Sequence, residues 1–250
     1  MAAEWGLEVI LEHHPYRQIG NKHRGAIVCV ADHASNNVPE GIDLGIPDRL
    51  LDLHIAHDIG VSGIAERMTR RFNIPAHLAT VSRLVCDFHR EEDHPKLVPN
   101  TSDGHLIPGN IGADVERRLK TLYRPYHDAL TEWLDEIQPR LIVSLHSFTP
   151  KLSSAQEDRP WEVSLLYNKD ERAARHAIRM FSEYGMVVGE NEPYSGSELN
   201  ATMNRHAEAL GRPYLFIEIR QDLIESRADQ SRWAGVIADV AGRVSEALKA

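Results

Sequence analysis

Short apolar runs alternate with longer amphipathic stretches along most of this chain. Five runs have the length and apolar content of buried strands: 26–32, 76–81, 141–146, 162–167 and 214–219. Their residues are too apolar for strands with one face in water, so we expect them to form the interior of a sheet that is covered on both faces.

Between these runs, apolar residues recur at intervals of three and four, which is typical of helices with one buried face. Helices are expected at 58–72, 114–137, 170–184, 201–210 and 233–248. Strands that alternate with helices favour a three-layer α/β/α fold with a mixed, mostly parallel sheet. The chain has 250 residues, a usual length for one such domain, which we expect to span residues 1–250.

Two segments interrupt this alternation. The stretch 82–90 carries a short apolar piece, 84–88, that is expected to be extended. The stretch 91–112 is rich in Pro, Gly, Asn, Asp and His and has little periodicity, so it is expected to be a long surface loop. Loops of this length inside compact domains are often lids or binding segments.

The composition excludes several classes of partner. The formal net charge is -9, so no face of the molecule is expected to neutralise a run of phosphates, and nucleic acid is not an expected partner. No apolar run reaches the roughly 20 residues that span a bilayer, and the first residues lack the pattern of a signal peptide. We therefore expect a soluble, cytoplasmic protein with no membrane partner. Cys29 and Cys86 both fall in expected strands, which fits buried, reduced thiols.

Two histidines, His33 and His146, each end an apolar run, although the two runs lie far apart in the sequence. A third run carries a carboxylate, Glu218. In open α/β sheets, active-site residues gather at the carboxyl ends of the strands. Two imidazoles and a carboxylate in that position could hold one metal ion and one water molecule, as in a zinc hydrolase. The alternative for each histidine alone is a hydrogen-bonded residue at a strand end.

The sequence offers two candidates for a third metal ligand. Asn36 stands where an H-x-x-E motif would place a carboxylate, but an amide is a poor zinc ligand, and Asn36 is kept as a candidate for substrate binding. Asp58, at the start of an expected helix, is the better ligand candidate; its alternative role is an acid favoured by the helix dipole. Asp32 is expected to point to the opposite face from His33, because side chains alternate along a strand.

Glu218 is a charged residue in an otherwise apolar strand. A buried glutamate needs a partner or a raised pKa. Both properties suit a general base that takes a proton from water and passes it to a leaving nitrogen. The alternative is a structural ion pair with Arg220, which shares the same face of the strand.

Arg83 and Arg90 flank a short segment that also contains Asp87 and His89. Guanidinium groups bind carboxylates through two parallel hydrogen bonds, so this pair could hold an acidic substrate. Asp87 could orient one of the arginines, and His89 could donate a hydrogen bond to the substrate. The alternative is that both arginines form surface or structural ion pairs.

Five stretches, in this order, resemble the N-formylglutamate amidohydrolase family, which is distantly similar to the zinc carboxypeptidases and aspartoacylases. They read DHASNNVP at 32–39, SRLVCDFHR at 82–90, YRPYHDAL at 123–130, LHSF at 145–148 and IEIRQDL at 217–223. The resemblance implies a phosphorylase/hydrolase-like α/β/α fold. It also implies hydrolysis of an N-acyl amino acid, which in the family's named reaction is N-formylglutamate giving formate and glutamate.

The same resemblance implies roles for individual residues. His33 and His146 would bind zinc, and Glu218 would be the catalytic glutamate. Arg83 and Arg90 would match arginines that bind the substrate carboxylate or polarise its carbonyl. The polar loop 194–206, with His206 at its end, would close over the acyl amino acid.

Three positions differ from the usual family pattern: Asn36, His89 and Ser144. His89 replaces a compact amide beside the expected substrate. Ser144 replaces an acidic residue that would orient His146. These differences imply a divergent branch and leave the acyl group and the amino acid of the substrate open.

The leading hypothesis is a zinc-dependent amidohydrolase of amino-acid catabolism that acts on a small-molecule acyl amino acid. Two alternatives stay open: a carboxypeptidase-like hydrolase of small peptides, and a non-catalytic ligand-binding protein that has lost the metal. Imidazole and carboxylate also accept iron, manganese or cobalt, so another divalent metal is an alternative to zinc. The sequence leaves the oligomeric state open.

Overall fold

The computed structural model of the chain describes residues 14–22, 26–154 and 158–249. Its centre is a seven-stranded sheet with the order β1-β3-β2-β6-β9-β7-β8. The strands are β1 Tyr16–Ile19, β2 Ile27–Ala31, β3 Ala76–Ala79, β6 Leu141–Phe148, β7 Val163–Leu166, β8 Val188–Glu190 and β9 Tyr214–Arg220. The four neighbours β3, β2, β6 and β9 run parallel, whereas β1 and β7 pair antiparallel with β3 and β9. The sheet is therefore mixed and mostly parallel, as the sequence predicts.

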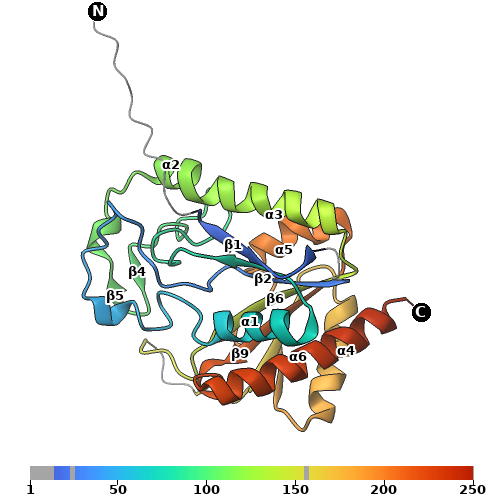
Figure 1. Ribbon diagram of the computed structural model, residues 1–250. Helices are drawn as coiled ribbons and strands as arrows, with labels where there is room; N and C mark the ends of the chain where they lie inside the picture. Colours follow the sequence, from blue (N-terminus) through green and yellow to red (C-terminus); the bar gives the residue numbers. More distant parts are fainter. Residues whose placement is uncertain (1–13, 23–25, 155–157, 250) are drawn as a thin grey trace, which may run out of the picture.

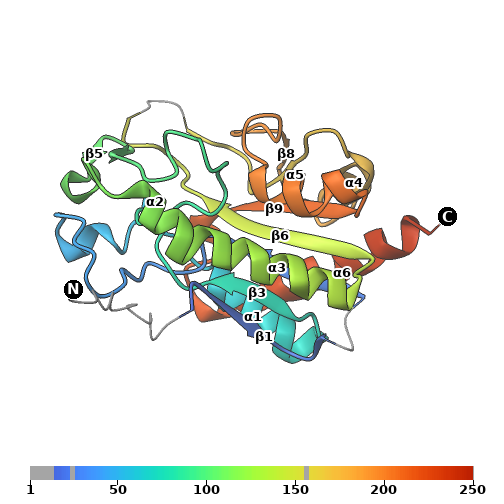
Figure 2. The same cartoon turned by 90° about the horizontal axis from the view of Figure 1, so that it is seen from above.

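Helices cover both faces of this sheet, so the three-layer α/β/α prediction is confirmed (Figure 1). The helices α1 Val61–Phe72, α4 Arg172–Glu183 and α6 Arg227–Ala247 lie on one face. On the other face lie α2 Val115–Arg118, α3 Arg124–Ile137 and α5 Ala201–His206 (Figure 2). A π-helical segment, Leu119–Tyr123, joins α2 to α3, so the helix expected at 114–137 is continuous. Among the described residues, no helix combines the length and apolar content that a bilayer span requires.

The start of α1 differs from the sequence prediction. The apolar periodicity suggests a helix from Asp58, but α1 begins at Val61 because Gly60 has a left-handed backbone with φ of 84°. A Cβ atom on Gly60 would lie 2.5 Å from the carbonyl oxygen of Ile224, so only glycine fits this turn. The turn leaves Asp58 outside the helix. The Asp58 amide donates to the carbonyl of His33, at 2.9 Å, which fixes Asp58 beside the end of β2.

The segment 84–88 is not extended, contrary to the sequence prediction. It forms consecutive turns, and its backbone amides at Val85 and Cys86 donate to the Ser82 carbonyl. Apolar composition alone cannot distinguish a strand from a buried turn, and here the side chains are buried without pairing in the sheet. Cys86 therefore lies outside the strands, whereas Cys29 lies in β2, and both are buried free thiols.

Two further segments of the fold are the long loop at 91–112 and the edge strand β1. The loop is largely irregular, apart from a small hairpin formed by β4 Thr101–Ser102 and β5 His105–Leu106 and a short 3-10 turn. The edge strand β1 was not predicted, because its residues are mostly polar and too few to show a pattern.

Alternation along β6 and β9 decides which side chains reach the α3 face of the sheet. Val143 and Leu145 pack with the core on the α1 side, together with Ile217. The intervening positions therefore face the α3 side. Two of these positions are His146 and Glu218, which lie directly opposite each other in the parallel pair β6–β9.

Candidate metal centre

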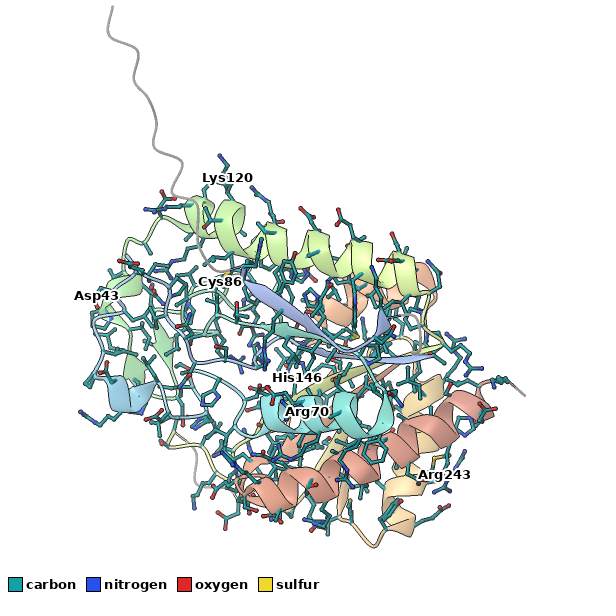
Figure 3. The ribbon with its side chains drawn as sticks, in the orientation of Figure 1. Asp43, Arg70, Cys86, Lys120, His146 and Arg243 are labelled. Carbon is teal, nitrogen blue, oxygen red and sulfur yellow. The ribbon has the colours of Figure 1, made fainter. Side chains whose placement is uncertain are left out.

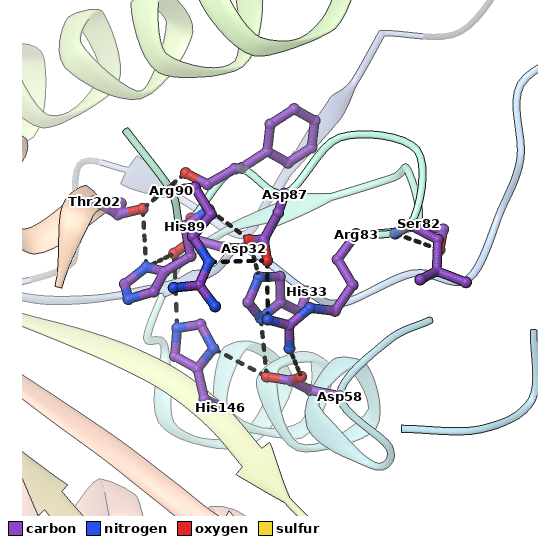
Figure 4. Close-up of polar contacts among 12 residues, drawn as sticks. Asp32, His33, Asp58, Ser82, Arg83, Asp87, His89, Arg90, His146 and Thr202 are labelled. Carbon is purple, nitrogen blue, oxygen red and sulfur yellow. Dashed lines mark hydrogen bonds and ion pairs between the residues drawn. The ribbon is translucent and has the colours of Figure 1, made fainter. Parts of the chain in front are cut away.

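A cluster of buried polar side chains lies at the carboxyl ends of β2, β6 and β9, where the sequence places it (Figure 4). His33 follows the end of β2, and His146 lies near the end of β6, in the interior of the molecule (Figure 3). The two imidazole centroids are 5.0 Å apart. Asp58 reaches the same point from the turn before α1, and all three side chains are no more than 3% exposed.

Three atoms converge within this cluster. Nδ1 of His146 lies 2.9 Å from Oδ2 of Asp58, and Nδ1 of His33 lies 3.4 Å from the same oxygen. All three atoms lie within 4.8 Å of one another, so one ion could contact all of them. Two imidazole nitrogens and one carboxylate oxygen, with space for a water molecule, are the donor set of a catalytic zinc site. The residues present therefore fit a divalent metal ion, and Asp58 supplies the carboxylate that position 36 lacks.

The other ring nitrogen of each histidine faces a second buried carboxylate. Nε2 of His33 lies 2.7 Å from Oδ1 of Asp87, and Nε2 of His146 lies 3.6 Å from Oδ2 of Asp32. Asp87 can accept the Nε2 proton of His33 and leave its Nδ1 free to bind a metal, whereas Asp32 makes a longer charge contact with Nε2 of His146. Asp32 is held in turn by the hydroxyl of Tyr126, which donates to Oδ1 at 2.7 Å.

The position of Asp32 corrects the sequence prediction. We expected it to point to the opposite face from His33, but Asp32 lies just beyond β2, in a turn, where strand alternation does not apply. Its carboxylate is fully buried beside His146. Asp32 therefore offers the acidic contact to His146 that Ser144 cannot make.

Asp32, His89 and His146 form a second group within metal-binding distance, so the part of the chain that the structure describes contains two such sets, sharing His146. Asp32 already accepts hydrogen bonds from Tyr126 and interacts with Nδ1 of His89 at 3.0 Å. Glu218 lies opposite His146 in the β6–β9 pair, and the charges of Asp58 and His33 act on its carboxyl group, whereas no such effect of Asp32 or His89 is resolved. We therefore take the Asp58 set as the candidate metal site.

Opposite charges at short range set the protonation of the candidate ligands. Burial alone would raise the pKa of Asp58, but the neighbouring His33 and His146 outweigh it and hold the pKa well below its ordinary value. Burial would lower the pKa of His146, yet its contacts with the carboxylates of Asp32 and Asp58 raise the pKa to about 10. The cluster without a metal thus stabilises a cation at the place where a metal ion would sit.

Glu218 has the opposite balance. Its side chain is 7% exposed, and burial, assisted by Asp58, raises its pKa to about 7 despite the positive charges of His146, His33 and Arg83. In the described part of the chain, its Oε2 atom has no hydrogen-bond partner. The alternative ion pair with Arg220 is not formed, because Arg220 binds Asp222 at 2.8 Å. Glu218 is therefore free to exchange a proton near neutral pH.

Arg83 and Arg90 are held by protein carboxylates. Nη2 of Arg83 donates to Asp87 at 2.9 Å, and its Nη1 donates to Asp58 at 3.4 Å. Nε of Arg90 lies 3.6 Å from the same Asp87 oxygen. Asp87 therefore contacts both arginines as well as His33. This network fixes the arginines beside the candidate metal site.

His89 belongs to the same cluster but faces protein groups. Its backbone amide donates to Asp87, and its Nδ1 lies 3.0 Å from Asp32 and 3.1 Å from the Thr202 hydroxyl. His89 is 5% exposed. A hydrogen bond from His89 to a substrate remains a prediction.

Asn36 and His206 lie outside the cluster. Asn36 donates to the Leu51 carbonyl at 3.1 Å and lines a cavity of about 420 Å³ whose wall includes Asp58 but neither His33 nor His146. His206 is the last residue of α5, so the stretch 194–206 is only partly a loop. Its ring stacks on His127, with Nε2 2.9 Å from His127 Nδ1, between α5 and α3.

The position of His206 leads to a prediction about acid stability. Burial lowers its pKa to about 4, from 6.5 in an exposed histidine. Below pH 6.5 the unfolded chain takes up a proton that the folded protein refuses until about pH 4, so stability is lost as the pH falls through this range.

A His206→Gln variant lacks this contribution to the pH dependence of stability. The decrease in unfolding free energy between about pH 8 and about pH 5.5 should shrink by about 1.4 kcal/mol relative to wild type. Urea unfolding at both pH values measures the difference. An identical pH dependence in both proteins would show that His206 titrates normally in the fold.

The sequence matches a known family over most of its length. Residues 25–225 match the sequence model of the N-formylglutamate amidohydrolases. The chain belongs to this family. The family resemblance drawn from the sequence is thereby confirmed, and membership supports an amidohydrolase activity with a small-molecule substrate. No curated protein matches the chain.

Two solved structures share the fold of this amidohydrolase-family chain over nearly its whole length. A gene product of Agrobacterium tumefaciens has 28% identity and a TM-score of 0.89, and the match covers 95% of this chain and 97% of that one. An N-formylglutamate amidohydrolase from Ralstonia eutropha has 20% identity and a TM-score of 0.69, with 95% and 99% coverage. At these identities the second structure supports the fold alone.

The contact between Asp32 and His146 can be tested by mutation. An Asp32→Asn variant keeps the size of the side chain but removes the charge beside Nε2 of His146. We expect zinc affinity to fall by roughly 10–100-fold, the usual effect of losing such a contact. Competition with a chromogenic chelator measures it. The exposed Asp52→Asn variant is the matched control, and unchanged affinity in Asp32→Asn would contradict the assigned role.

Proposed function

We propose that this chain is a metal-dependent amidohydrolase that cleaves an N-acyl amino acid, with N-formylglutamate, which would give formate and glutamate, as the first substrate to test. The observation that carries the proposal is the convergence of His33, Asp58 and His146 beside a buried glutamate that has no hydrogen-bond partner among the described residues. Zinc is the first metal to test, because this donor set is typical of zinc hydrolases. The reaction would be a step of amino-acid breakdown.

His33, Asp58 and His146 would hold the metal ion, which when bound supplies a Lewis acid for the acyl carbonyl and lowers the pKa of a water molecule. Glu218 accepts a proton from that water through its carboxylate. It then returns the proton to the nitrogen of the leaving amino acid, so that the amide bond breaks with a neutral amine as the leaving group. The raised pKa of Glu218, about 7, suits both steps near neutral pH.

Arg83 completes the proposed machinery. It lies against both Asp58 and Asp87, and the charges of these carboxylates keep its guanidinium protonated. From this position it would stabilise the negative charge that develops on the acyl oxygen during attack. Its two ion pairs would also keep Asp58 and Asp87 in place around His33.

The possibility of a non-catalytic protein rested on the missing carboxylate of the H-x-x-E motif. Asp58 lies at hydrogen-bonding distance from His146 and is the candidate for this carboxylate. Its position supports an enzyme rather than a binding protein.

Metal analysis of the purified protein, followed by an assay of formate release from N-formylglutamate with and without a chelator, tests the proposal. We expect about one bound zinc per chain and an activity that disappears with the chelator and returns with zinc. Formate release that does not depend on any metal would overturn the mechanism. If metal is bound but formylglutamate is not cleaved, a panel of other N-acyl amino acids and dipeptides distinguishes a different deacylase from a peptidase.

A further inference from the structure

Arg83 and Arg90, the arginines that the sequence suggests for substrate binding, already contact protein carboxylates. Arg83 donates to Asp87 and Asp58, and Arg90 approaches Asp87. A guanidinium whose charge is balanced by protein carboxylates attracts a substrate carboxylate less strongly than one without a counter-ion. A group with a free charge near the site is therefore a better candidate for that role.

Arg159 has this property. Its side chain is half-buried, and it forms no ion pair with any residue in 14–22, 26–154 or 158–249. Only its Nη1 atom donates hydrogen bonds, to the Thr149 carbonyl at 3.2 Å and to the Tyr194 hydroxyl at 3.0 Å. The Nε and Nη2 atoms, which form one edge of the guanidinium, have no partner within the described residues. Two parallel donors on one edge match the two oxygens of a carboxylate.

Aromatic rings fix the orientation of this guanidinium. It lies 4.8 Å from the centroid of Tyr194 and 6.0 Å from that of Phe148. Phe148 ends β6 and shares the sheet face of His146, two residues earlier. Cation–π contacts with two rings hold the guanidinium in place and occupy none of its N–H donors.

The backbone around Arg159 is tied to the strands that carry the site. Its amide donates to the Pro150 carbonyl at 3.0 Å, just beyond β6. Its carbonyl accepts from Nη1 of Arg220 at 3.3 Å, and Arg220 ends β9, two residues after Glu218. Arg159 is thus fixed relative to both His146 and Glu218.

Electrostatic effects also place this arginine beside the site. Burial raises the pKa of Tyr194, and the charges of Arg159, Glu218 and Arg83 all act on the same phenol. The phenol of Tyr194 therefore contacts Arg159 directly and lies within the electrostatic range of Glu218 and Arg83.

We propose that Arg159 is a specificity-determining residue that binds a carboxylate of the substrate, and that Tyr194 positions its guanidinium. This inference rests on the proposed function and deepens it, because it restricts the substrate to an acyl amino acid whose carboxylate can reach Arg159. Family membership does not assign any role to this residue. A half-buried charge without a counter-ion costs free energy, and an anionic ligand would remove that cost.

The test compares two substrates and three variants on the zinc-loaded protein. The substrates are N-formylglutamate and N-formylglutamine amide, which has no carboxylate. With N-formylglutamate, Arg159→Gln should lower kcat/KM by roughly 100-fold or more, mostly through KM, since charged bidentate hydrogen bonds are strong. With the neutral amide, the same variant should stay within about threefold of wild type.

Two further variants separate binding from general damage. Tyr194→Phe keeps the aromatic ring but removes the hydroxyl, and should raise KM for N-formylglutamate by roughly threefold to tenfold, with no change for the neutral amide. Arg172→Gln removes a surface arginine that pairs with Asp170, and should change neither substrate. An equal loss on both substrates in Arg159→Gln, or no loss on either, would overturn the proposal.

A binding measurement keeps this inference separable from the proposed reaction. Calorimetry with glutarate, a dicarboxylate that cannot be hydrolysed, should detect binding to wild type and to Arg172→Gln but not to Arg159→Gln. If wild type cleaves neither substrate yet shows this binding pattern, the proposed reaction fails and the carboxylate site stands. Glutarate binding that survives in Arg159→Gln, or a wild type that binds no carboxylate, overturns the inference.

Discussion

Replacement of Glu218 by glutamine is expected to lower kcat by about 10³-fold while the metal remains bound. Glutamine has nearly the same size and shape, so the packing of β9 against β6 should persist. It cannot accept a proton from water or return one to the leaving nitrogen. The measurement is a steady-state assay of formate release, with zinc content determined on the same sample.

The position of Glu218 explains the size of this effect. The side chain lies opposite His146 in the β6–β9 pair, is almost fully buried, and has a pKa raised to about 7. No other carboxylate could take over easily, since Asp58 and Asp87 have pKa values held well below the ordinary range.

A surface glutamate supplies the control for this experiment. Glu190 lies on β8 and pairs with Arg175 at the surface, so Glu190→Gln should retain wild-type kcat. A Glu218→Gln variant with full activity would remove Glu218 as the general base. Loss of zinc together with activity would instead assign Glu218 a role in metal binding.

The second large effect is expected at Asp58. Asp58→Asn should lower zinc affinity by more than about 100-fold, because loss of a metal ligand costs more than loss of an outer carboxylate. Activity should fall in proportion to the bound metal at limiting zinc. Asparagine keeps the shape of the side chain and part of the hydrogen bonding to the two histidines, so the fold should survive. Zinc stoichiometry and competition with a chelator measure the change.

Asn36 provides the matched control, because the H-x-x-E spacing would make position 36 the third ligand. In the structure its amide donates to the Leu51 carbonyl instead. Asn36→Ala should therefore bind zinc with wild-type affinity. Retained zinc in Asp58→Asn together with lost zinc in Asn36→Ala would reverse the assignment of the third ligand.

In the candidate metal centre, each of the two histidines has a carboxylate beside both of its ring nitrogens. Asp58 meets the Nδ1 atoms, while Asp87 and Asp32 face the Nε2 atoms. This arrangement fixes the orientation and protonation of both rings before any metal arrives. It also explains why so many acidic residues can be buried together, since each contacts at least one basic or donor group.

Several parts of the site could be predicted from the sequence because the underlying rules are local. Apolar runs that end in His33 and His146 identify strands, and the strand-end rule places their side chains at one edge of a parallel sheet. Glu218 is a charged residue of an otherwise apolar strand, and this pattern likewise indicates a residue of the site. These inferences need no knowledge of which strands are neighbours.

Other parts depended on contacts between distant segments. Strand alternation failed for Asp32 because β2 ends at Ala31. Periodicity failed for the start of α1 because Gly60 has a left-handed backbone, packed so closely against Ile224 that no Cβ atom fits. Arg159 has no distinguishing neighbours in the sequence. Its importance comes from an edge of the guanidinium that lacks a partner in the described structure.

The sequence by itself determined the alternation of strands and helices and the family. It also identified His33, His146 and Glu218 as candidates for the site. Hydrophobic periodicity and ordered motifs are properties of the chain alone. Only the tertiary structure decided that Asp58 meets both histidines and that Asp32 and Asp87 face their outer nitrogens. It also decided that Arg159 has no ion-pair partner among the described residues. The physical reason is that a ligand set and a charge balance depend on distances between segments far apart in the sequence, such as Asp58 and His146, which are 88 residues apart. These distances exist only after the sheet has assembled.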